Sequence, residues 1–374
     1  MTTIGLCMIV KNEAHVIERC LNSVKPLIDF VLIVDTGSTD DTVNIINHWL
    51  TDNTMPGRVY HHDWIDFATN RTQALQEMER LKVDYILMID ADEVLEFPIA
   101  NGEKYIQDLK NSLSLDCYNI PMICGTSHYD RPQLFRNDGT FYFKGVLHEY
   151  LERSQPMTKG RLPGLRIRAI QDSARNQNPA KYRQDAEILA AAYGNEKDPF
   201  IQQRYVFYWA QCLKGSGQLE KSIEAYHLRA ALGGWIEEVY WSLYQIAVLR
   251  QQLAQDDAQV IQDYLGAYEV LPSRAEALHG AMRLCRLQNK FYQGYMIADR
   301  ALRIPMPSSA LFTESWIYDY GLLDEFSIAA YYVGEYQESL MASERLINEK
   351  KYPASQSERI EKNREFAKAR QSGI

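Results

Sequence analysis

Two aspartates separated by one residue follow a short apolar run. Asp90, Ala91 and Asp92 come directly after residues 85–89, which read Tyr-Ile-Leu-Met-Ile. In an extended segment the side chains at i and i+2 point to the same side, so both carboxylates can converge on one cation or on a substrate hydroxyl. Mg²⁺ and Mn²⁺ take oxygen ligands and commonly bridge to phosphate oxygens. The spacing therefore predicts a Mn²⁺ or Mg²⁺ site, and a strand followed by an acidic surface turn is the alternative.

The composition limits the classes of protein and of partner. A chain of 374 residues predicts two domains. The net charge of −9, without a concentrated Lys/Arg tract, argues against nucleic acid as a partner. We find no transmembrane-length apolar segment and no features of a secretory leader at the start, and we therefore expect a cytoplasmic protein. The six cysteines lack metal-ligand spacing and are expected to be reduced and mostly buried.

Strands and helices alternate in the first half of the chain. Apolar strands are predicted at 4–10 and 30–34, and each runs into a polar cluster, at 11–13 and 35–41. Strands without polar alternation that are linked by helices predict an α/β domain with a mostly parallel sheet covered on both faces. Ligands bind beyond the carboxyl ends of the strands in such sheets. We therefore expect both clusters to share one sheet edge with residues 90–93.

Together these clusters resemble a known enzyme family. They are Val10-Lys11-Asn12-Glu13, Val34-Asp35-Thr36-Gly37-Ser38-Thr39-Asp40, Asp66-Phe67 with Arg71, and Asp90-Ala91-Asp92. In this order they closely resemble family 2 glycosyltransferases over roughly the first 170 residues. The resemblance implies a Rossmann-like GT-A fold and the inverting transfer of a sugar from a nucleotide diphosphate donor, with UDP as the default nucleotide.

The resemblance also implies roles on the donor side. The donor-binding residues would be Val10, Asn12, Glu13, Asp35, Ser38, Arg71, Asp90, Ala91 and Asp92. Asp35 would hydrogen-bond the base, and Arg71 would face the diphosphate. Asp90 would contact the ribose or a sugar hydroxyl, while Asp92 would bind the metal. Alternatives stay open, because Asp35 and Ser38 suit turns or helix caps and Arg71 could be a solvated helical arginine.

A later segment supplies candidates for the acceptor side. Residues 142–150 are predicted to form a strand whose end carries His148 and Glu149, and in the resembling family a Gly-x-x-His-Glu element stands at this place. A histidine beside a carboxylate can ligate a metal or transfer a proton. Glu149 is the preferred base for the acceptor's proton and His148 a metal or diphosphate ligand. These two roles could be exchanged, and Asp130 is a third catalytic candidate.

The sequence leaves open the last metal ligand and two alternative functions. Either His148 or Asp172 could supply the last metal ligand, since related chains often carry a histidine where this chain has Gln171-Asp172. Asp90 and Asp92 after an apolar strand also look like the nucleophile motif of haloacid-dehalogenase-type phosphohydrolases. A catalytically inactive sugar-nucleotide-binding scaffold with helical repeats is the third hypothesis.

The second half of the chain has helical periodicity. A polar stretch at 172–178 separates the halves and predicts domains at 1–175 and 176–374. A pattern of turn, apolar and small residues recurs after Gly217, Asn289 and Gly334, and the first two lie 72 residues apart, about twice the roughly 34-residue tetratricopeptide period. The spacing predicts stacked helix pairs in an irregular solenoid. The region resembles the tetratricopeptide-like tail of family 2 enzymes near the sublancin-type peptide S-glycosyltransferases.

This helical half bears on the partners. Its many aromatic residues between 205 and 244 are expected mainly to form the solenoid core. Some could line a concave surface for an acceptor or a second subunit. The predicted partners are a nucleotide-diphosphate sugar, a glycan or peptide acceptor and, through the helical domain, a second copy of the chain.

Overall fold

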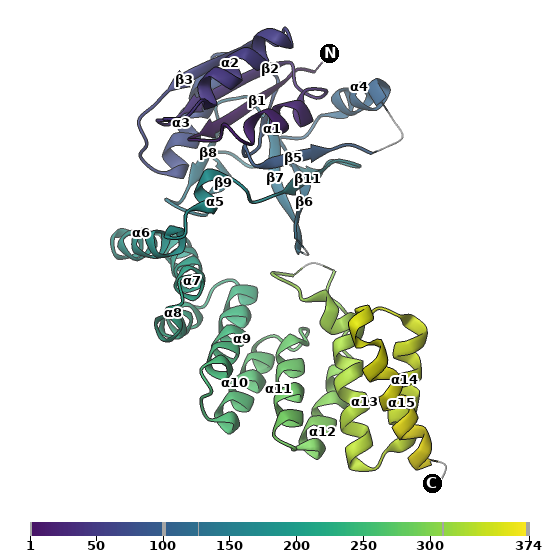
Figure 1. The fold of residues 1–374 in the computed structure, drawn as a ribbon. Helices are drawn as coiled ribbons and strands as arrows, with labels where there is room; N and C mark the ends of the chain where they lie inside the picture. The colour runs from purple at the N-terminus through teal and green to yellow at the C-terminus, as the bar shows by residue number, and fades with distance from the viewer. Residues whose placement is uncertain (1, 99–101, 126, 309, 372–374) are drawn as a thin grey trace. The chain divides into compact units, whose positions relative to one another are not determined.

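The computed structural model describes residues 2–98, 102–125, 127–308 and 310–371 (Figure 1). The chain divides into two compact units, Met1–Ala192 and Tyr193–Ile374. The first contains all the strands of the described residues and the second only helices, which confirms the predicted order of an α/β domain and a helical domain. α5 (Ala174–Gln177) and most of α6 (Lys181–Asn195) belong to the first unit. The functional boundary between residues 175 and 176 stays a prediction.

A mixed sheet forms the centre of the first unit. Its order is β3-β2-β1-β4-β7-β6-β11-β5, and β10 pairs with β6. β3, β2, β1 and β4 are mutually parallel, as predicted, whereas β7 runs antiparallel to β4 and β6. The strands are β1 (Ile4–Val10), β2 (Phe30–Asp35), β3 (Gly57–His61), β4 (Tyr85–Met88), β5 (Glu93–Glu96), β6 (Cys117–Cys124), β7 (Ser127–Arg136), β10 (Lys159–Arg161) and β11 (Arg166–Ala169). β8 (Phe141–Lys144) and β9 (Tyr150–Arg153) form a separate hairpin.

Helices cover both faces of this sheet because its strands are apolar on both sides. Leu6 and Met8 of β1 face a core that includes α1 (Ile17–Val24) and α2 (Thr42–Asp52). α4 (Gly102–Ser112) adds Leu109 to the same core. On the opposite face, Cys7 packs with α3 (Phe67–Glu79). The prediction of a sheet buried on both faces is therefore confirmed.

The strand register brings the polar clusters together. Val10 lies beside Asp35 in the β1–β2 pair, and Cys7 lies beside Met88 in the β1–β4 pair. The three carboxyl ends therefore meet at one sheet edge, as expected. Two segments differ from the predicted strands. β4 ends at Met88, and residues 145–149 form a loop between β8 and β9, so His148 and Glu149 are loop residues.

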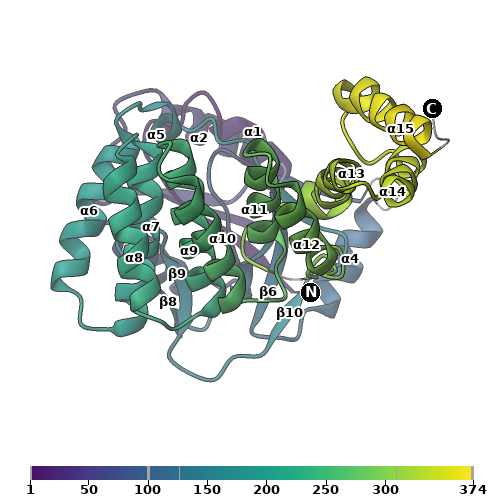
Figure 2. The ribbon, with the colours of Figure 1, turned by 90° about the horizontal axis from the view of Figure 1, so that it is seen from below.

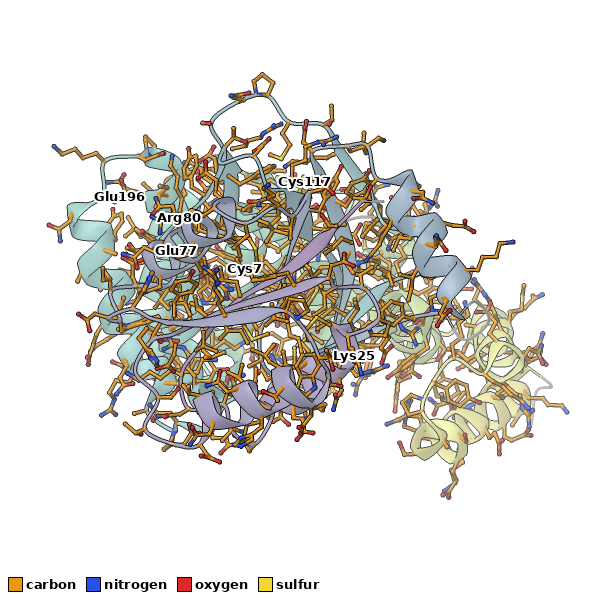
Figure 3. The ribbon with its side chains drawn as sticks, turned by 90° about the horizontal axis from the view of Figure 1, so that it is seen from above. Cys7, Lys25, Glu77, Arg80, Cys117 and Glu196 are labelled. Atoms are coloured by element: carbon orange, nitrogen blue, oxygen red, sulfur yellow. The ribbon has the colours of Figure 1, made fainter. Side chains whose placement is uncertain are left out.

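The cysteines are free thiols, as predicted. Five of the six are buried and Cys124 is partly exposed. Figure 3 labels Cys7 and Cys117, which lie on strands of the first unit. Burial raises the pKa of Cys7 to about 12, so this thiol is unreactive at neutral pH.

The second unit is an array of consecutive helices, each packed against the next (Figure 2). None of the described helices is long and apolar enough to cross a membrane. The helices are α7 (Pro199–Gly215), α8 (Leu219–Ala231), α9 (Ile236–Gln252), α10 (Asp257–Val270), α11 (Glu276–Leu287), α12 (Phe291–Ala301), η1 (Ile317–Gly321), α13 (Leu322–Val333), α14 (Tyr336–Glu349), η2 (Ala354–Gln356) and α15 (Ser357–Gln371).

The recurring sequence pattern marks the turns within helix pairs. Gly217, Asn289 and Gly334 have φ angles of 77°, 56° and 93°, a region that Gly and Asn adopt more readily than other residues. The small residue of the pattern then approaches the preceding helix. Ser222 Oγ donates to the carbonyl of Ala210 at 2.7 Å. The predicted stacking of helix pairs is therefore confirmed.

Most of the strongly aromatic stretch contributes to the core, as expected. Tyr205, Phe207, Tyr226 and Tyr240 are at most 3% exposed. Trp235 is the contrasting case, since half of its surface is exposed.

Candidate functional site

Two loops at the sheet edge are tied together by side-chain hydrogen bonds. Asn12 has a φ of 59°, which suits Asn, and its N–H donates to Ser38 Oγ at 2.9 Å. The side-chain oxygen of Asn12 accepts from the Thr39 N–H at 2.7 Å. The Glu13 N–H donates to Thr42 Oγ1 at 2.8 Å. The loop after β1 and the loop after β2 therefore form one surface.

Asp35 shapes the second of these loops. Its carboxylate is 2% exposed and accepts from the N–H groups of Gly37 and Ser38 at 3.2 and 3.1 Å. The adjacent Thr36 donates through both N–H and Oγ1 to the carbonyl of Val10, whose side chain is buried. A direct contact between Val10 and a donor therefore stays a prediction. A contact between Asp35 and the donor's base stays a prediction.

Asp90 and Asp92 diverge instead of sharing one side. The Glu93 N–H donates to the carbonyl of Asp90 at 3.0 Å, and the Asp90 N–H donates back to Glu93 Oε2 at 3.0 Å. These bonds close a turn in which Ala91 is buried. The alternation of an extended segment, assumed from the sequence, therefore does not apply here. The two carboxylates acquire different partners.

Asp90 belongs to a cluster of two arginines and three carboxylates. Arg71 of α3 lies 2.6 Å from Asp90 through Nη2 and 2.7 Å from Glu149 through Nε. Arg131 of β7 lies 2.6 Å from Glu93 and 3.8 Å from Asp90. Burial favours the neutral form of Asp90, but the two guanidinium groups outweigh it and keep its pKa below the usual value. The structure thus joins three predicted residues, Arg71, Asp90 and Glu149.

No sequence pattern predicts the contact between Arg131 and Glu93, which joins Arg131 to this cluster. Burial raises the pKa of Glu93 against the opposing charge of Arg131. The two residues are 38 positions apart, and neither lies in a motif whose spacing implies the contact. A periodic strand pattern can place Arg131 on β7 but cannot identify its partner.

Asp92 faces a segment from the end of the first unit. Its Oδ2 accepts from the Ser173 N–H at 3.3 Å and from the Asn176 side chain at 3.1 Å. Lys181 Nζ in turn donates to Asn176 Oδ1 at 2.5 Å. Asp172, the alternative metal ligand, is instead held by Arg19 at 2.7 Å. Residues 172–177 therefore lie against the proposed donor edge, near which the resemblance had placed Asp172, but Ser173 and Asn176 make the contacts with Asp92.

Glu13 is a second buried acid at this edge. It is 8% exposed, and its Oε2 accepts from the Ala174 N–H at 3.4 Å. Burial is the main reason that the pKa of Glu13 rises to about 7, with a further contribution from the charge of Asp92. Glu13 thus changes its charge near neutral pH.

The other two acceptor-side candidates lie in more open positions. His148 is exposed and has a φ of 53° in the loop that also holds Glu149. Asp130 is 39% exposed at its side chain and lies 3.2 Å from Arg161. Among the described residues, no hydrogen bond or ion pair joins Asp130 to Arg71 or Glu149.

The oxygen ligands available at this sheet edge indicate how a metal ion could be bound there. In the described part of the chain, no three His, Cys, Asp or Glu side chains form a ligand group. Asp92 accepts its hydrogen bonds through Oδ2, and Oδ1 has no hydrogen-bond partner within the described residues. Mg²⁺ is commonly held by one or two carboxylates together with substrate phosphates. Asp92 therefore fits a cation that is bound jointly with a diphosphate, rather than one held by protein ligands alone.

Comparisons with known proteins agree with this geometry. Residues 6–149 match the family described as Glycosyl transferase family 2. The TPR repeat-containing protein Synpcc7942_0270 of Synechococcus elongatus is 32% identical over 171 residues, 45% of this chain and 40% of that protein. An uncharacterized glycosyltransferase of Rickettsia felis is 34% identical over 136 residues, 36% of this chain and 44% of that protein.

A third relative is the SPbeta prophage-derived glycosyltransferase SunS of Bacillus subtilis. It is 31% identical over 150 residues, which cover 39% of this chain and 34% of SunS. In all three cases the matched part spans less than half of the relative's own length.

Proposed function

We propose, because residues 6–149 form a family 2 glycosyltransferase domain, that this protein is an inverting glycosyltransferase. The family match is the observation that carries the proposal. It begins in β1 and ends at Glu149, so it includes every residue predicted for the donor and the preferred base. The structure supports the proposal by joining Arg71, Asp90 and Glu149 at the sheet edge.

We place the donor on the surface formed by the loops after β1, β2 and β4, in a catalytic domain of residues 1–175. Asn12, Glu13, Asp35 and Ser38 would receive the nucleoside, with UDP as the proposed nucleotide. Asp92 would hold Mn²⁺ or Mg²⁺ together with the donor's diphosphate. The ion would neutralise charge on that leaving group. His148 is the further candidate ligand.

The proposed chemistry assigns the proton to Glu149. Arg71 contacts only Oε1 of this carboxylate, and Oε2 has no hydrogen-bond partner among the described residues. Glu149 Oε2 would accept the acceptor's proton while the acceptor atom bonds to the anomeric carbon and the bond to the diphosphate breaks. Arg71 would act by orienting Glu149 and Asp90. Its direct contact with the diphosphate, like a catalytic role for Asp130, stays a prediction.

The acceptor follows from the class of enzyme rather than from a described contact. We propose a glycan or a peptide as acceptor, with the helical domain of residues 176–374 binding it or mediating a homodimer. A cytoplasmic location is proposed with it.

A screen of nucleotide sugars with Mn²⁺ tests the donor. A donor at a hundredfold its Kd stabilises by about 2.7 kcal/mol, or roughly 5–10 °C in Tm for a domain of this size. We expect one UDP-sugar to give such a shift. Asp92→Asn should lose metal-dependent turnover and keep its fold, whereas Asp52→Asn, a change of an exposed acid at the end of α2, should keep its turnover.

Three other outcomes would contradict the proposal. If no nucleotide sugar raises Tm, the donor assignment is wrong. Hydrolysis of aryl phosphates that depends on Asp90 would support the phosphohydrolase. A donor that binds without turnover across a broad acceptor panel would support the inactive scaffold.

A further inference from the structure

The helical unit contains a cavity, lined by charged and aromatic side chains, that the proposed transfer does not use. Its volume is about 250 Å³, and it lies between α11, η1, α13 and α15. Pockets for drug-sized ligands commonly measure about 300–1,000 Å³, so this cavity suits a ligand of about one sugar ring.

An irregular helix forms one wall of the cavity. η1, residues Ile317–Gly321, is a π-helical turn, and such turns are frequent at functional sites. Trp316 precedes it, is 40% exposed and meets the ring of His279 edge-on at 4.9 Å. A Cβ at Gly321 would lie 2.9 Å from Trp316 and 3.1 Å from His279 Nε2. Gly321 therefore allows the two rings their close position beside the cavity.

His279 supplies ring nitrogens that form no hydrogen bond with the described residues. Its side chain lines the cavity although the residue is only 5% exposed. Neither ring nitrogen has a hydrogen-bond partner among the described residues. Burial, assisted by the charge of Arg283, lowers the pKa of His279 to about 4, so the ring is neutral at pH 7. A neutral imidazole donates one hydrogen bond and accepts another, which matches a ligand hydroxyl.

Of the three arginines that line the cavity, two form ion pairs with carboxylates and one forms none with the described residues. Arg286 forms a two-pronged contact with Glu325 at 2.6 and 3.0 Å. Arg359 does the same with Asp324 at 2.7 and 3.0 Å. Arg283 also lines the cavity, is exposed, and has no ion pair within the part of the chain that the structure describes. The cavity therefore carries one uncompensated positive charge.

We propose that this cavity binds a hexose unit that carries one anionic group, a carboxylate or a phosphate. The sugar ring packs on Trp316, a hydroxyl bonds to His279, and the anionic group pairs with Arg283. An aromatic face with convergent polar groups is the expected composition of such a site. This is a second sugar site, separate from the donor edge, and its existence does not depend on transfer.

Isothermal titration of the full chain tests the site with defined probes. The probes are glucose 6-phosphate, glucuronic acid, glucose and inorganic phosphate. We expect saturable binding of at least one charged hexose. Arg283→Gln should weaken it about ten- to hundredfold, the value of a charge-assisted hydrogen bond. Binding of glucose, where it is measurable, should not respond to that change.

Matched variants locate the binding. Trp316→Leu should weaken the binding of both charged and neutral hexoses. Trp235→Leu, which changes a tryptophan of the same unit that is 50% exposed against 40% for Trp316, should leave binding unchanged. Arg303→Gln is the corresponding control for Arg283, because Arg303 is an exposed arginine outside the cavity. Thermal unfolding of each variant is the check that its fold is retained.

Three results would overturn the proposal. The first is that no probe gives saturable heat at millimolar concentration. The second is that charged hexoses bind Trp316→Leu and Arg283→Gln as tightly as the wild type. The third is that inorganic phosphate binds as tightly as glucose 6-phosphate. The last would mean a simple anion site. Because no turnover is measured, none of these results bears on the proposed glycosyltransferase, and an inactive transferase would not affect this test.

Discussion

Each unit of the protein contains a buried arginine that holds two carboxylates, but the two clusters differ in access. Arg71 in the first unit contacts Asp90 and Glu149, which come from the ends and loops of different strands. The side chain of Asp90 is 33% exposed, and that of Glu149 is 13% exposed. A ligand that reaches this edge can meet carboxylate oxygens directly.

In the helical unit the central pair, Arg274 with Glu276, is closed to solvent, and only the outer carboxylate of Glu237 is 17% exposed at its side chain. Arg274 is fully buried and lies 2.7 Å from Glu276, which is also fully buried, and 2.6 Å from Glu237. Tyr240 and Tyr318 donate their hydroxyls to the same Glu276. The protein itself therefore satisfies both charged groups.

The difference is consistent with one kind of ion pair in two roles, stability in the helical unit and the proposed function at the sheet edge. A buried pair must recover the cost of removing its charges from water, and it does so through further hydrogen bonds. In the helical unit those bonds link α9, α11 and η1, so the cluster holds helices together. At the sheet edge Glu149 Oε2 and Asp92 Oδ1 have no hydrogen-bond partner among the described residues and are free for the proposed substrate and cation. The predictions below test this division between function and stability.

The largest expected effect is on catalysis. Glu149→Gln keeps an acceptor for Arg71 Nε but cannot take a proton, so kcat should fall about 10²- to 10⁴-fold, the usual contribution of a general base. Donor affinity, measured by calorimetry, should change little. Glu152→Gln, on the neighbouring strand β9 and paired with Lys144, is the control and should keep full turnover. Full turnover in Glu149→Gln would remove this residue as the base.

A change in the buried cluster of the helical unit should affect stability and leave donor binding intact. Arg274→Met leaves the fully buried Glu276 without its partner, and breaking such a buried pair costs about 3–5 kcal/mol. Urea unfolding should report this loss for the helical unit, while the Kd for the donor stays unchanged. Arg345→Met removes an exposed pair with Glu349 and should cost less than about 1 kcal/mol. If Arg274→Met weakened donor binding without loss of stability, the two clusters would not differ as argued.

Ionisation of Glu13 at the sheet edge should lower the free energy of unfolding above neutral pH. The folded-state pKa of Glu13 is raised from 4.5 to about 7, so its favourable contribution is fully present below pH 4.5 and is lost as the pH rises through about 7. Glu13→Gln should therefore be about 1–3 kcal/mol more stable than the wild type at pH 8, and this advantage should shrink towards pH 5. Denaturant unfolding at both pH values measures it. The exposed Glu187→Gln should show no such gain.

The sequence predicted what depends on local patterns and missed what depends on distant contacts. Apolar runs located β1 and β2, and their parallel pairing explains why the loops with Asn12 and Asp35 meet. The same reasoning failed at Asp90 and Asp92, because the Glu93 side chain closes a turn there. The contact between Asp92 and Asn176 joins residues 84 positions apart. Periodicity and spacing carry no information about such a pair.

The smallest expected effects come from the helix pairs, where a local pattern did predict the packing. Ser339 Oγ donates to the carbonyl of Ser327 at 2.7 Å, just as Ser222 does in the earlier pair. Ser339→Ala should cost about 0.5–1.5 kcal/mol in urea unfolding, because it removes one hydrogen bond between helices and leaves the carbonyl its partner within the helix. Ser343 is the control, since it is equally buried but bonds to Ser339 of its own helix at 2.9 Å. If Ser343→Ala costs as much as Ser339→Ala, the contact between helices is not the reason that the pattern carries a small polar residue at this position.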